Sequence, residues 1–516
     1  MRRSLRLPLL FAAAAAALLA DRGAVWAEPA AEPAAAAEPF SRARWMQEHK
    51  ARLGIDEMRH PTLGRRKAAR GPIAAMPLPA RVGLKNLRVS LDILGDAAPG
   101  QQETQTEPHM AIDPRNEQRL LAAYQEGRFS PGGARTLTYA WSSDGGKRWR
   151  EGRLPGLTRD QGGLYERVSD PWVAFGPDGQ AYYVSLAFDE TTPANGLYVS
   201  ASPDGGRTWG APVAVHTNSS PDFFDDKQSI VVDTRGDSPY RGRVYVGWDT
   251  ATNDRQILRV SHSADEGVSW SAPAALVDRA GAGNVGIVMA VGPGGVVHAV
   301  WTLWEPTGPD TALTTLLASR SEDGGASWSA PVPIAALLAA GVPGMRTGEI
   351  LPSLAVDPRN GKLYVAWQDA RNTVSVDQIL LARSTDGGRS WSAPVLVSDG
   401  PADAPAFTPA VAVNGKGVVG VAYSSLRNDP NRNHWVDQYI AFSKNGGGGF
   451  GASRRVTARS FPASAAAISR GWFLGDYQGL VAGKVLFRPL FVGTLLPSAQ
   501  DPSRRQPDAF TATVRP

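Results

Sequence analysis

The strongest constraint in this chain is an eight-residue pattern, S-x-D-x-G-x-x-W, which recurs along most of its 516 residues. Six copies are recognisable, the last of them degenerate: SSDGGKRW at 142–149, SPDGGRTW at 202–209, SADEGVSW at 263–270, SEDGGASW at 321–328, STDGGRSW at 384–391 and SKNGGGGF at 443–450. Their third residues, from Asp144 to Asn445, are 58 to 63 residues apart. Such a fixed period indicates one supersecondary unit copied along the chain.

Each copy has the composition of a tight turn between two strands. An aspartate can accept hydrogen bonds from backbone N–H groups of the turn, glycines adopt positive φ without strain, and the terminal aromatic can pack beneath the loop. We therefore interpret these segments as structural hairpins and not as reactive centres.

A second repeated unit, strand–turn–strand, precedes each hairpin and often ends in an aromatic residue. Its copies are 110–125, 172–188, 229–248, 287–301, 353–367 and 410–423, and a seventh copy at 479–492 has no hairpin pattern after it. Four strands per roughly 60 residues, repeated radially, are typical of a β-propeller. The sequence thus predicts an all-β fold over 84–516.

The length of the repetitive region gives the number of blades. Residues 87–514, divided by a period of about 60, predict seven blades, with six as the alternative. The last copy would supply three strands, ending at Phe510 to Val514, and the early segment from Leu87 to Leu94 would supply the fourth. This closure would leave no exposed sheet edge.

Composition excludes several classes of site. Hydrophobic residues make up 42% of the chain, enough for a packed core, and the absence of cysteine excludes disulfides, thiolate metal sites and a cysteine nucleophile. The net charge of +5 is too small to indicate nucleic-acid binding. We also recognise no metal-ligand spacing, and we expect no metal and no cofactor.

The N-terminus reads as a leader followed by an extension. Arginines at positions 2, 3 and 6 precede an apolar run over 7–20, which predicts a signal peptide over 1–27 and a secreted or periplasmic protein without stable membrane insertion. Residues 28–83 are expected to be a disordered or linker extension. Within it, 41–53 can form one short helix with Ser41 as its cap.

The repeated S-x-D-x-G-x-x-W segments closely resemble those of the Asp-box, or bacterial neuraminidase repeat, superfamily of sialidase-like propellers. The resemblance covers roughly residues 85–516. It implies a propeller, whereas activity varies among such proteins, which include sialidases, other glycosidases and non-enzymatic propellers. Sialidases of the family use three arginines for the sugar carboxylate, a tyrosine nucleophile assisted by a glutamate, and an aspartate acid/base; their N-terminal Arg-Ile-Pro signature is absent here.

In a propeller, the starts of the first strands and the ends of the second strands meet at one mouth of the central channel. Acidic and basic residues occupy these positions: Glu107, Asp170, Asp225, Asp226, Lys227, Glu349, Asp476 and Tyr477 at first strands, and Glu126, Asp189, Asp249, Glu305, Asp369, Arg371 and Arg427 after second strands. Carboxylates gathered there can acquire raised pKa values and act as acid/base pairs. The alternative is that they cap strands and bond neighbouring blades.

From this ring we select candidates for chemistry. The catalytic candidates, with individual roles left open, are Asp226, Glu349, Asp369, Asp476 and Tyr477. The substrate-binding candidates are Arg128, Arg346, Arg371, Arg427 and the sugar-stacking Trp472. We expect a monomeric, secreted, sialidase-like glycoside hydrolase that acts on a glycan at the top face of the propeller; the alternative is a non-catalytic propeller that binds a glycan or a protein.

Overall fold

The computed structural model of the protein describes residues 39–53, 84–94, 99–308, 311–373, 375–429, 434–495 and 505–516. The chain divides into two units, Met1–Pro39 and Phe40–Pro516, and all of the described helices and strands belong to the second. The expected signal peptide, nearly all of the spacer after it and residues 54–83 of the extension lie outside the described residues. Within the described part, no helix is long and apolar enough to cross a membrane.

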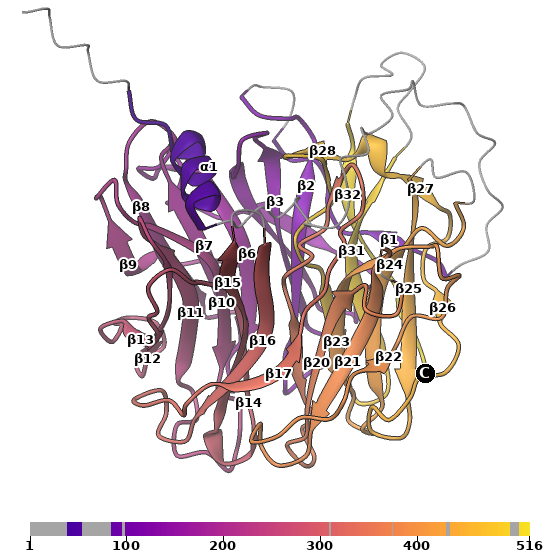
Figure 1. The fold of residues 1–516 in the computed structure, drawn as a ribbon. Coiled ribbons are helices and arrows are strands. Elements are labelled where there is room, and N and C mark those ends of the chain that lie inside the picture. Colours follow the sequence, from indigo (N-terminus) through magenta and orange to yellow (C-terminus); the bar gives the residue numbers. More distant parts are fainter. Residues whose placement is uncertain are drawn as a thin grey trace, which may run out of the picture. The chain divides into compact units, whose positions relative to one another are not determined.

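The second unit is all-β apart from a few short helices. In its sheets, four strands that follow one another in the sequence pair antiparallel in that order (Figure 1). The first two groups, joined by a bridge between β4 and β6, are β2 (Gln105–Ile112), β3 (Leu120–Arg128), β4 (Ala134–Ser142) and β5 (Arg150–Arg153), then β6 (Arg167–Phe175), β7 (Ala181–Phe188), β8 (Asn195–Ser202) and β9 (Val213–Asn218).

The same order recurs through the middle of the chain. The next two sheets are β10 (Phe224–Val232), β11 (Val244–Ala251), β12 (Gln256–Ser263) and β13 (Ala274–Val277), then β14 (Gly283–Val291), β15 (Val297–Gly308), β16 (Thr311–Ser321) and β17 (Val332–Ala336). Two more are β19 (Ser353–Val356), β20 (Leu363–Asp369), β21 (Gln378–Ser384) and β22 (Val395–Leu396), then β23 (Ala406–Val413), β24 (Val419–Ser425), β25 (Trp435–Ser443) and β26 (Arg454–Arg455), with β27 (Phe461–Pro462) also paired to β25.

One sheet joins the two ends of the described chain. Its strands are β30 (Gly479–Ala482), β31 (Phe487–Thr494), β32 (Pro507–Thr511) and β1 (Leu87–Arg88). The pairing of Leu87 with Thr511 confirms the predicted closure, although β1 is much shorter than the expected strand. The early strand therefore completes the last sheet.

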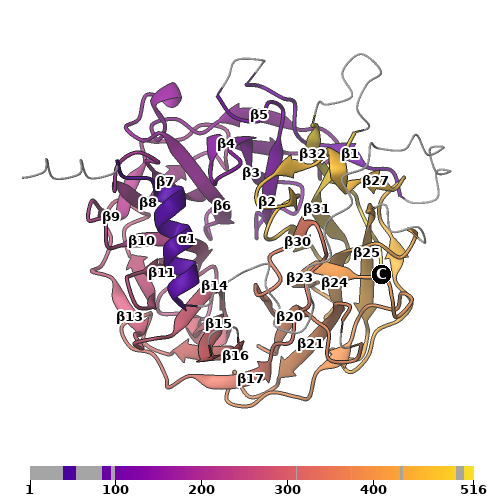
Figure 2. The same cartoon turned by 45° about the horizontal axis from the view of Figure 1, so that its top comes forward.

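The first strands of successive sheets contact one another in a closed circuit. β2 contacts β6, and the contacts continue through β10, β14, β19, β23 and β30 back to β2. Figure 2 shows the sheets following one another around a common centre, with these strands on the inner side. The arrangement is propeller-like, as the repeat predicts.

Aromatic residues of the second strands fill the space between adjacent sheets. Trp248, Trp301 and Trp367 are fully buried, and each packs against apolar residues of the preceding sheet. Burial of such large side chains contributes most of the attraction between the sheets. The core therefore lies in layers between sheets.

The repeated S-x-D-x-G-x-x-W segments form the predicted hydrogen-bonded turns between third and fourth strands. In the second copy, Asp204 Oδ1 accepts from the backbone N–H groups of Arg207 (3.0 Å) and Thr208 (2.9 Å), and Gly206 N–H donates to Ser202 Oγ (2.8 Å). Gly205 and Gly206 have φ of 75° and 90°. Even the degenerate copy keeps a bond from Gly448 N–H to Asn445 Oδ1.

Two smaller features lie at the other end of the sheets from these turns (Figure 1). They are α1 (Arg42–Leu53) and a small sheet of β18 (Met345–Arg346), β29 (Trp472–Phe473) and β28 (Ala467–Ile468). The 3-10 helices are η1 (Arg159–Gln161), η2 (Pro293–Gly295) and η3 (Ala463–Ala465). α1 occupies the segment in which the sequence predicts a helix, and Arg44 N–H donates to Ser41 Oγ as expected for a cap.

Candidate functional site

A recurrent β-bulge places charged residues at the centre of the molecule. Four first strands shift register around a residue with positive φ: Glu107 (52°), Asp170 (52°), Lys227 (50°) and Thr408 (50°). Gly286 holds the same position in β14. A non-glycine residue in this conformation is strained, and bulges commonly re-aim side chains next to functional sites.

The bulge also corrects the predicted strand starts. The sequence pattern begins the first strands at or near Met110, Trp172, Ser229 and Ala410, but the pairing continues beyond the bulge, so that β2 already begins at Gln105. The bulge interrupts the alternation of buried side chains, which hides this part of the strand from pattern analysis. The charged residues are therefore inside strands and not in the loops before them.

Lys227 is the hub of the charged residues. Its Nζ lies 2.6 Å from Asp476 Oδ2, 3.6 Å from Asp170 Oδ2 and 3.8 Å from Glu107 Oε1. The Lys227 side chain is 9% exposed and the three carboxylates are at most 3% exposed. We call Lys227, these three carboxylates, Asp226, Arg128 and Arg346 the central cluster.

Two arginines complete the cluster from the side of the small sheet. Arg346 binds Asp476 with two nitrogens, its Nε lying 2.8 Å from Asp476 Oδ1. Arg128 Nη2 and Arg346 Nη1 both donate to Ser469 Oγ, at 3.1 and 3.3 Å. Both guanidinium groups also lie over the ring of Phe473, at 4.7 and 4.6 Å from its centre. Two like charges are thus held side by side, next to carboxylates that offset their repulsion.

Three carboxyl groups of consecutive sheets form a hydrogen-bonded chain, Glu107–Asp170–Asp226. Burial and the nearby Asp170 charge raise the pKa of Glu107 well above its ordinary value, and burial raises the pKa of Asp226 to about 7. Burial would also raise the pKa of Asp170, but Lys227 and the bonds from its two neighbours outweigh it and lower that pKa. The pKa of the middle carboxyl, Asp170, is thus lowered, while the pKa values of its two neighbours are raised.

Aromatic rings line the same region. Tyr477 O–H donates to the carbonyl of Pro171 (3.1 Å), and burial together with the charges of Glu107 and Asp170 raises the pKa of Tyr477 well above its ordinary value. The ring of Tyr477 lies 5.4 Å from that of Trp172, which in turn stacks on His109 at 4.0 Å. These rings form an apolar floor beside the carboxyl chain.

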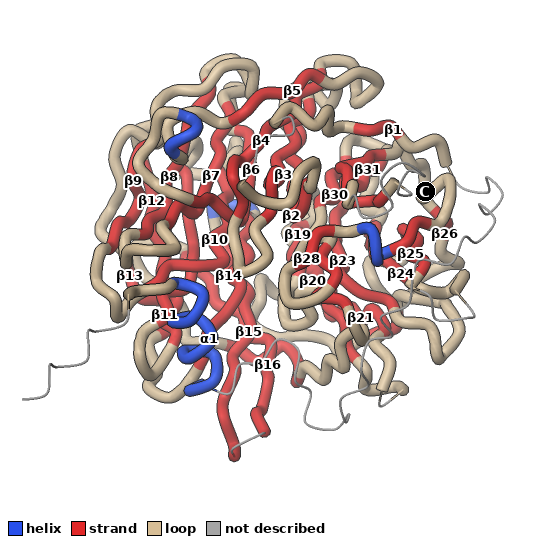
Figure 3. The backbone as a smooth tube through the Cα atoms, turned by 90° about the horizontal axis from the view of Figure 1, so that it is seen from above, coloured by secondary structure: helices blue, strands red, loops and turns tan. Residues whose placement is uncertain are grey.

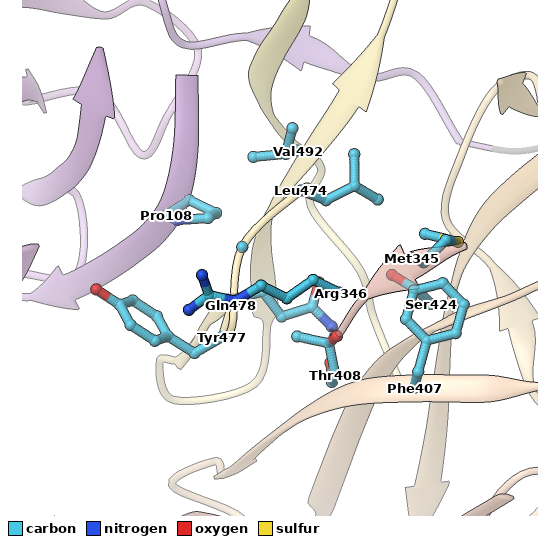
Figure 4. A pocket seen from close by; sticks show the side chains of 11 residues that line it. Pro108, Met345, Arg346, Phe407, Thr408, Ser424, Leu474, Tyr477, Gln478 and Val492 are labelled. Atoms are coloured by element: carbon cyan, nitrogen blue, oxygen red, sulfur yellow. Dashed lines mark hydrogen bonds between the residues drawn. The ribbon is translucent and has the colours of Figure 1, made fainter. Parts of the chain in front are cut away.

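A small pocket opens beside Arg346 and Tyr477 (Figure 4). Its polar lining comes from these two residues together with Thr408, Ser424 and Gln478. Its apolar lining is Pro108, Met345, Phe407, Leu474 and Val492. The pocket therefore joins a cation to an apolar wall.

Gly475 allows the segment that carries Asp476 to cross β2 closely. A Cβ at this position would lie 2.8 Å from Glu107 N, whose N–H donates to Leu474 O. The φ of Gly475 is 145°, a region that favours glycine. The approach of segment 474–476 to the bulge of β2 brings Asp476 to Lys227.

The structure brings together five of the ten sequence-predicted site residues. They are Asp226, Asp476, Tyr477, Arg128 and Arg346. Two more lie at the same end of the sheets. Glu349 is buried in a loop, where its Oε2 accepts from Thr347 Oγ1. Trp472 belongs to the small sheet, in which it pairs with Met345, and it packs edge-on against His434. Their catalytic and binding roles stay predictions.

Three predicted residues do not join the cluster, which corrects the expectation that they line one opening. Asp369 is fully buried and bound by Arg371, which lies 2.8 Å away through its Nε. It also accepts from Trp367 Nε1. Arg427 pairs with Asp399 at 2.7 Å and lies over the ring of Tyr439. At the ends of these second strands, the residues bond locally because a partner is available within a few residues or in the adjacent turn.

Sequence reasoning placed Glu107, Asp170 and Lys227 on the predicted ring but did not select them as candidates for chemistry. Ser469 and Phe473 were missed altogether. A usable signal was present for Glu107 and Asp170, since a charged residue before proline recurs in Glu107-Pro108 and Asp170-Pro171 at the same position of the repeat, whereas Lys227 is followed by glutamine. Ser469 and Phe473 belong to no repeated pattern of this kind. In the described ranges, no group of His, Asp and Glu side chains is arranged to hold a metal ion.

Comparisons with known proteins give weak likenesses. No known family profile matches the chain. A sialidase of Bacteroides fragilis is 31% identical over 97 residues, which are 16% of this chain and 18% of that protein. The chain thus matches less than a fifth of the length of this relative, and the match does not assign a family.

Solved structures resemble the chain more broadly but distantly. An α-L-arabinanase of Penicillium chrysogenum with bound arabinobiose aligns over 84% of this chain and 98% of its own, with 14% identity and a TM-score of 0.47. A Hadza microbial sialidase covers 84% and 95% at 13% identity and a TM-score of 0.44, and an ulvan lyase covers 80% and 94% at 12% identity and 0.48. At such scores, the function has to be argued from the side chains of the site.

Proposed function

We propose that the protein is a secreted, monomeric, sialidase-like glycoside hydrolase on a seven-bladed propeller, with its active site at the central cluster. The observation that carries this proposal is the carboxyl pair Asp170–Asp226 on adjacent first strands. The pKa of Asp226 is raised to about 7 and that of Asp170 is lowered. Acid/base catalysis requires such a pair, in which one carboxyl donates a proton and the other accepts one. Secretion follows from the leader-like N-terminus.

Asp226 is best suited to be the general acid. It is partly accessible, whereas Glu107 and Asp170 are buried. In its protonated form, Asp226 would donate a proton to the glycosidic oxygen as the bond to the anomeric carbon breaks. The hydroxyl of Tyr477 would attack that carbon and lose its proton, and ionised Asp170, whose charge acts on Tyr477, would be the acceptor.

The cations of the cluster favour an acidic sugar. Lys227, Arg128 and Arg346 all belong to the central cluster, Arg346 also lines the pocket, and Arg128 Nε is buried without a hydrogen-bond partner. A sugar carboxylate could bind these groups with bidentate geometry. This charge arrangement is the reason for choosing sialosides as the first substrates to test.

The test is hydrolysis of a fluorogenic sialoside by the wild type, Asp226→Asn, Tyr477→Phe and the control Asp222→Asn, an exposed aspartate in the loop before β10. We expect both site variants to lower kcat at least about 100-fold, as loss of a general acid or a nucleophile does, and the control to keep it. Activity should also fall as the pH rises through about 7, because Asp226 must be protonated. Retention of full activity in Asp226→Asn would refute the assignment.

A second function, glycan binding without catalysis, is favoured by one observation. Both oxygens of Asp476 are engaged by Arg346 and Lys227, so these cations already have a buried partner. If this function is correct, the wild type will cleave none of a panel of sialosides and related polysaccharides but will bind one of them. Arg128→Ala should then weaken the binding measured by calorimetry.

A further inference from the structure

The helix α1, which lies outside the repeats, packs beside the central cluster. Arg42 and His49 are buried and Trp45 and Met46 are half-buried, and these four residues have the i, i+3, i+4, i+7 spacing of one helix face; Ala43 and Lys50 are also half-buried. Trp45 and Met46 pack against the apolar cluster of β7, β8, β10 and β11. Figures 2 and 3 show the helix on the end of the sheets where the first strands begin.

The N-terminal end of α1 is fixed by Glu190, in the loop after β7. Glu190 Oε1 accepts from Ser41 Oγ (2.9 Å) and from the backbone N–H of Ala43 (3.0 Å), and its carbonyl accepts from Arg42 N–H (2.9 Å). A carboxylate at a helix N-terminus also interacts favourably with the helix dipole. The helix therefore has a defined starting point on the sheet below it.

The first turn of α1 contacts Phe224, the first residue of β10. The Arg42 guanidinium, itself 2% exposed, lies 4.6 Å from the centre of the Phe224 ring and donates to the carbonyl of Pro193. The ring of Trp45 lies 6.4 Å from that of Phe224. Phe224 comes two residues before Asp226, so the contact bears directly on the backbone that leads into the bulge.

The last turns of α1 carry a cation, Lys50, whose charge acts on the Asp226 carboxyl. The charge of Lys50 lowers the pKa of Asp226, opposing burial, which raises it. The other charged groups that face Asp226 are Lys227 of its own strand, Asp170 of β6 and Asp249 of β11. The charge of Lys50 is therefore the way in which α1 affects the pKa of Asp226, whose other charged neighbours belong to the sheets.

We propose that α1 is a positioning element of the site, which holds Phe224 in place through Arg42 and Trp45. The helix fixes the backbone over 224–227, and with it the direction of the Asp226 and Lys227 side chains. The contribution of α1 to catalysis rests on the proposed function, whereas its effect on the backbone over 224–227 does not.

The first experiment measures amide hydrogen exchange in the whole chain without any substrate. The probes are the N–H groups of Asp225, which donates to Asn195 Oδ1, and Lys227, which donates to Asp226 Oδ1. In Trp45→Ala and Arg42→Ala we expect these amides to exchange at least about tenfold faster, with amides of β20 and β21 unchanged as evidence of an intact fold. The control is Gln47→Ala, an exposed position of the same helix. Unchanged exchange at both probes would overturn the proposal.

The second experiment follows the Asp226 carboxyl by carbon NMR as a function of pH, with Asp226→Asn to assign the signal. Lys50→Gln should raise the midpoint of this titration, and Glu48→Gln, which alters an exposed charge of the same helix, should leave it in place. Equal midpoints in the wild type and Lys50→Gln would contradict the effect of the Lys50 charge on Asp226. Neither experiment uses turnover, so a failure of the glycosidase proposal and a failure of the positioning proposal give different results.

If sialosides are hydrolysed, one further readout connects the two proposals. Lys50→Gln should shift the alkaline limb of the kcat/KM profile to higher pH, because Asp226 would stay protonated over a wider range. A uniform loss of kcat/KM at all pH values would indicate a merely structural role for Lys50 and would contradict the effect of its charge on the acid.

Discussion

At the residue scale, the central cluster is stable because each buried charge has an opposite charge or a proton to offset it. Asp476 is bound by Arg346 and Lys227, while Glu107 and Asp226, whose pKa values are raised and which therefore take up a proton more readily, hydrogen-bond to Asp170. Burial of an unpaired charge would cost several kcal/mol. The consequences of removing one group therefore depend on whether that group is charged in the folded protein.

The carboxyls of Asp476 and Glu107 should differ sharply when they are replaced by amides. Asp476→Asn leaves the positive charges of Arg346 and Lys227 without their shared partner, and we expect a loss of about 3 kcal/mol in the free energy of unfolding. Glu107→Gln replaces a carboxyl whose pKa burial raises well above its ordinary value, so that an amide resembles its favoured form, and we expect a loss below about 1 kcal/mol. Urea denaturation at pH 7 measures both, and equal losses would refute the expected difference between the two carboxyls.

Asp226 should make the stability of the protein depend on pH. Its pKa is raised from 3.8 to about 7 on folding, so between these values the folded protein holds a proton that the unfolded chain releases. Its contribution to stability is therefore fully present below pH 3.8 and declines as the pH rises to about 7. Asp226→Asn should remove this decline and be more stable than the wild type above pH 7, on the order of 2 kcal/mol. Urea denaturation at pH 5 and pH 8 checks the sign.

At the element scale, the repeated turns and the bulges differ in how far the sequence reveals them. The turns are local: their hydrogen bonds join residues two to four apart, so an eight-residue pattern specifies them. A bulge depends on pairing with a strand whose partner residue lies some 20 positions away, such as Thr106 with Gln125. The residue pattern therefore predicted the hairpins and missed the bulges that aim Glu107, Asp170 and Lys227.

The aspartates of the turns should contribute to stability and not to activity. Asp204→Ala removes acceptors for the N–H groups of Arg207 and Thr208 and for the Thr208 hydroxyl. We expect a loss of about 1–2 kcal/mol in the free energy of unfolding, with hydrolysis and glycan binding unchanged. Calorimetric melting, compared with Asp178→Ala at an exposed turn of the same sheet, separates this local effect from a general one. A change in activity without a change in melting would place the turn in the site.

At the scale of the whole molecule, the sheet formed by both ends of the described chain closes the circuit of sheets. β1 and β32 are short, but Ala509 and Thr511 are buried, Asp508 accepts from Ser90 Oγ, and Phe487 pairs with Val514. Neighbouring sheets hold one another across apolar layers, so an open sheet would expose the layers on both sides of it.

Removal of residues 505–516 should therefore affect the entire ring. We expect the truncated chain to lose its cooperative thermal transition or to melt at least about 10 °C lower, because the last sheet loses its third strand and its contact with β1. Differential scanning calorimetry tests this expectation, with Arg515→Ala, which leaves β32 and its pairing intact, as the control. An unchanged transition in the truncated chain would show that the circuit does not depend on this closure.

The sequence by itself determined the module: its period of about 60 residues, the hairpin in each copy, the strand order, the closure by the early strand, and the end of the sheets at which charged residues collect. These features depend on contacts within one copy, or on a pattern repeated often enough to be read. Only the tertiary structure decided which charges meet. Lys227 and Asp476 are 249 residues apart, and their contact depends on a bulge, a close crossing at Gly475 and the circuit of sheets, whereas Asp369 and Arg371 bond to each other because they are neighbours. A long-range pair depends on the packing of every sheet between its members, and no local pattern contains that information.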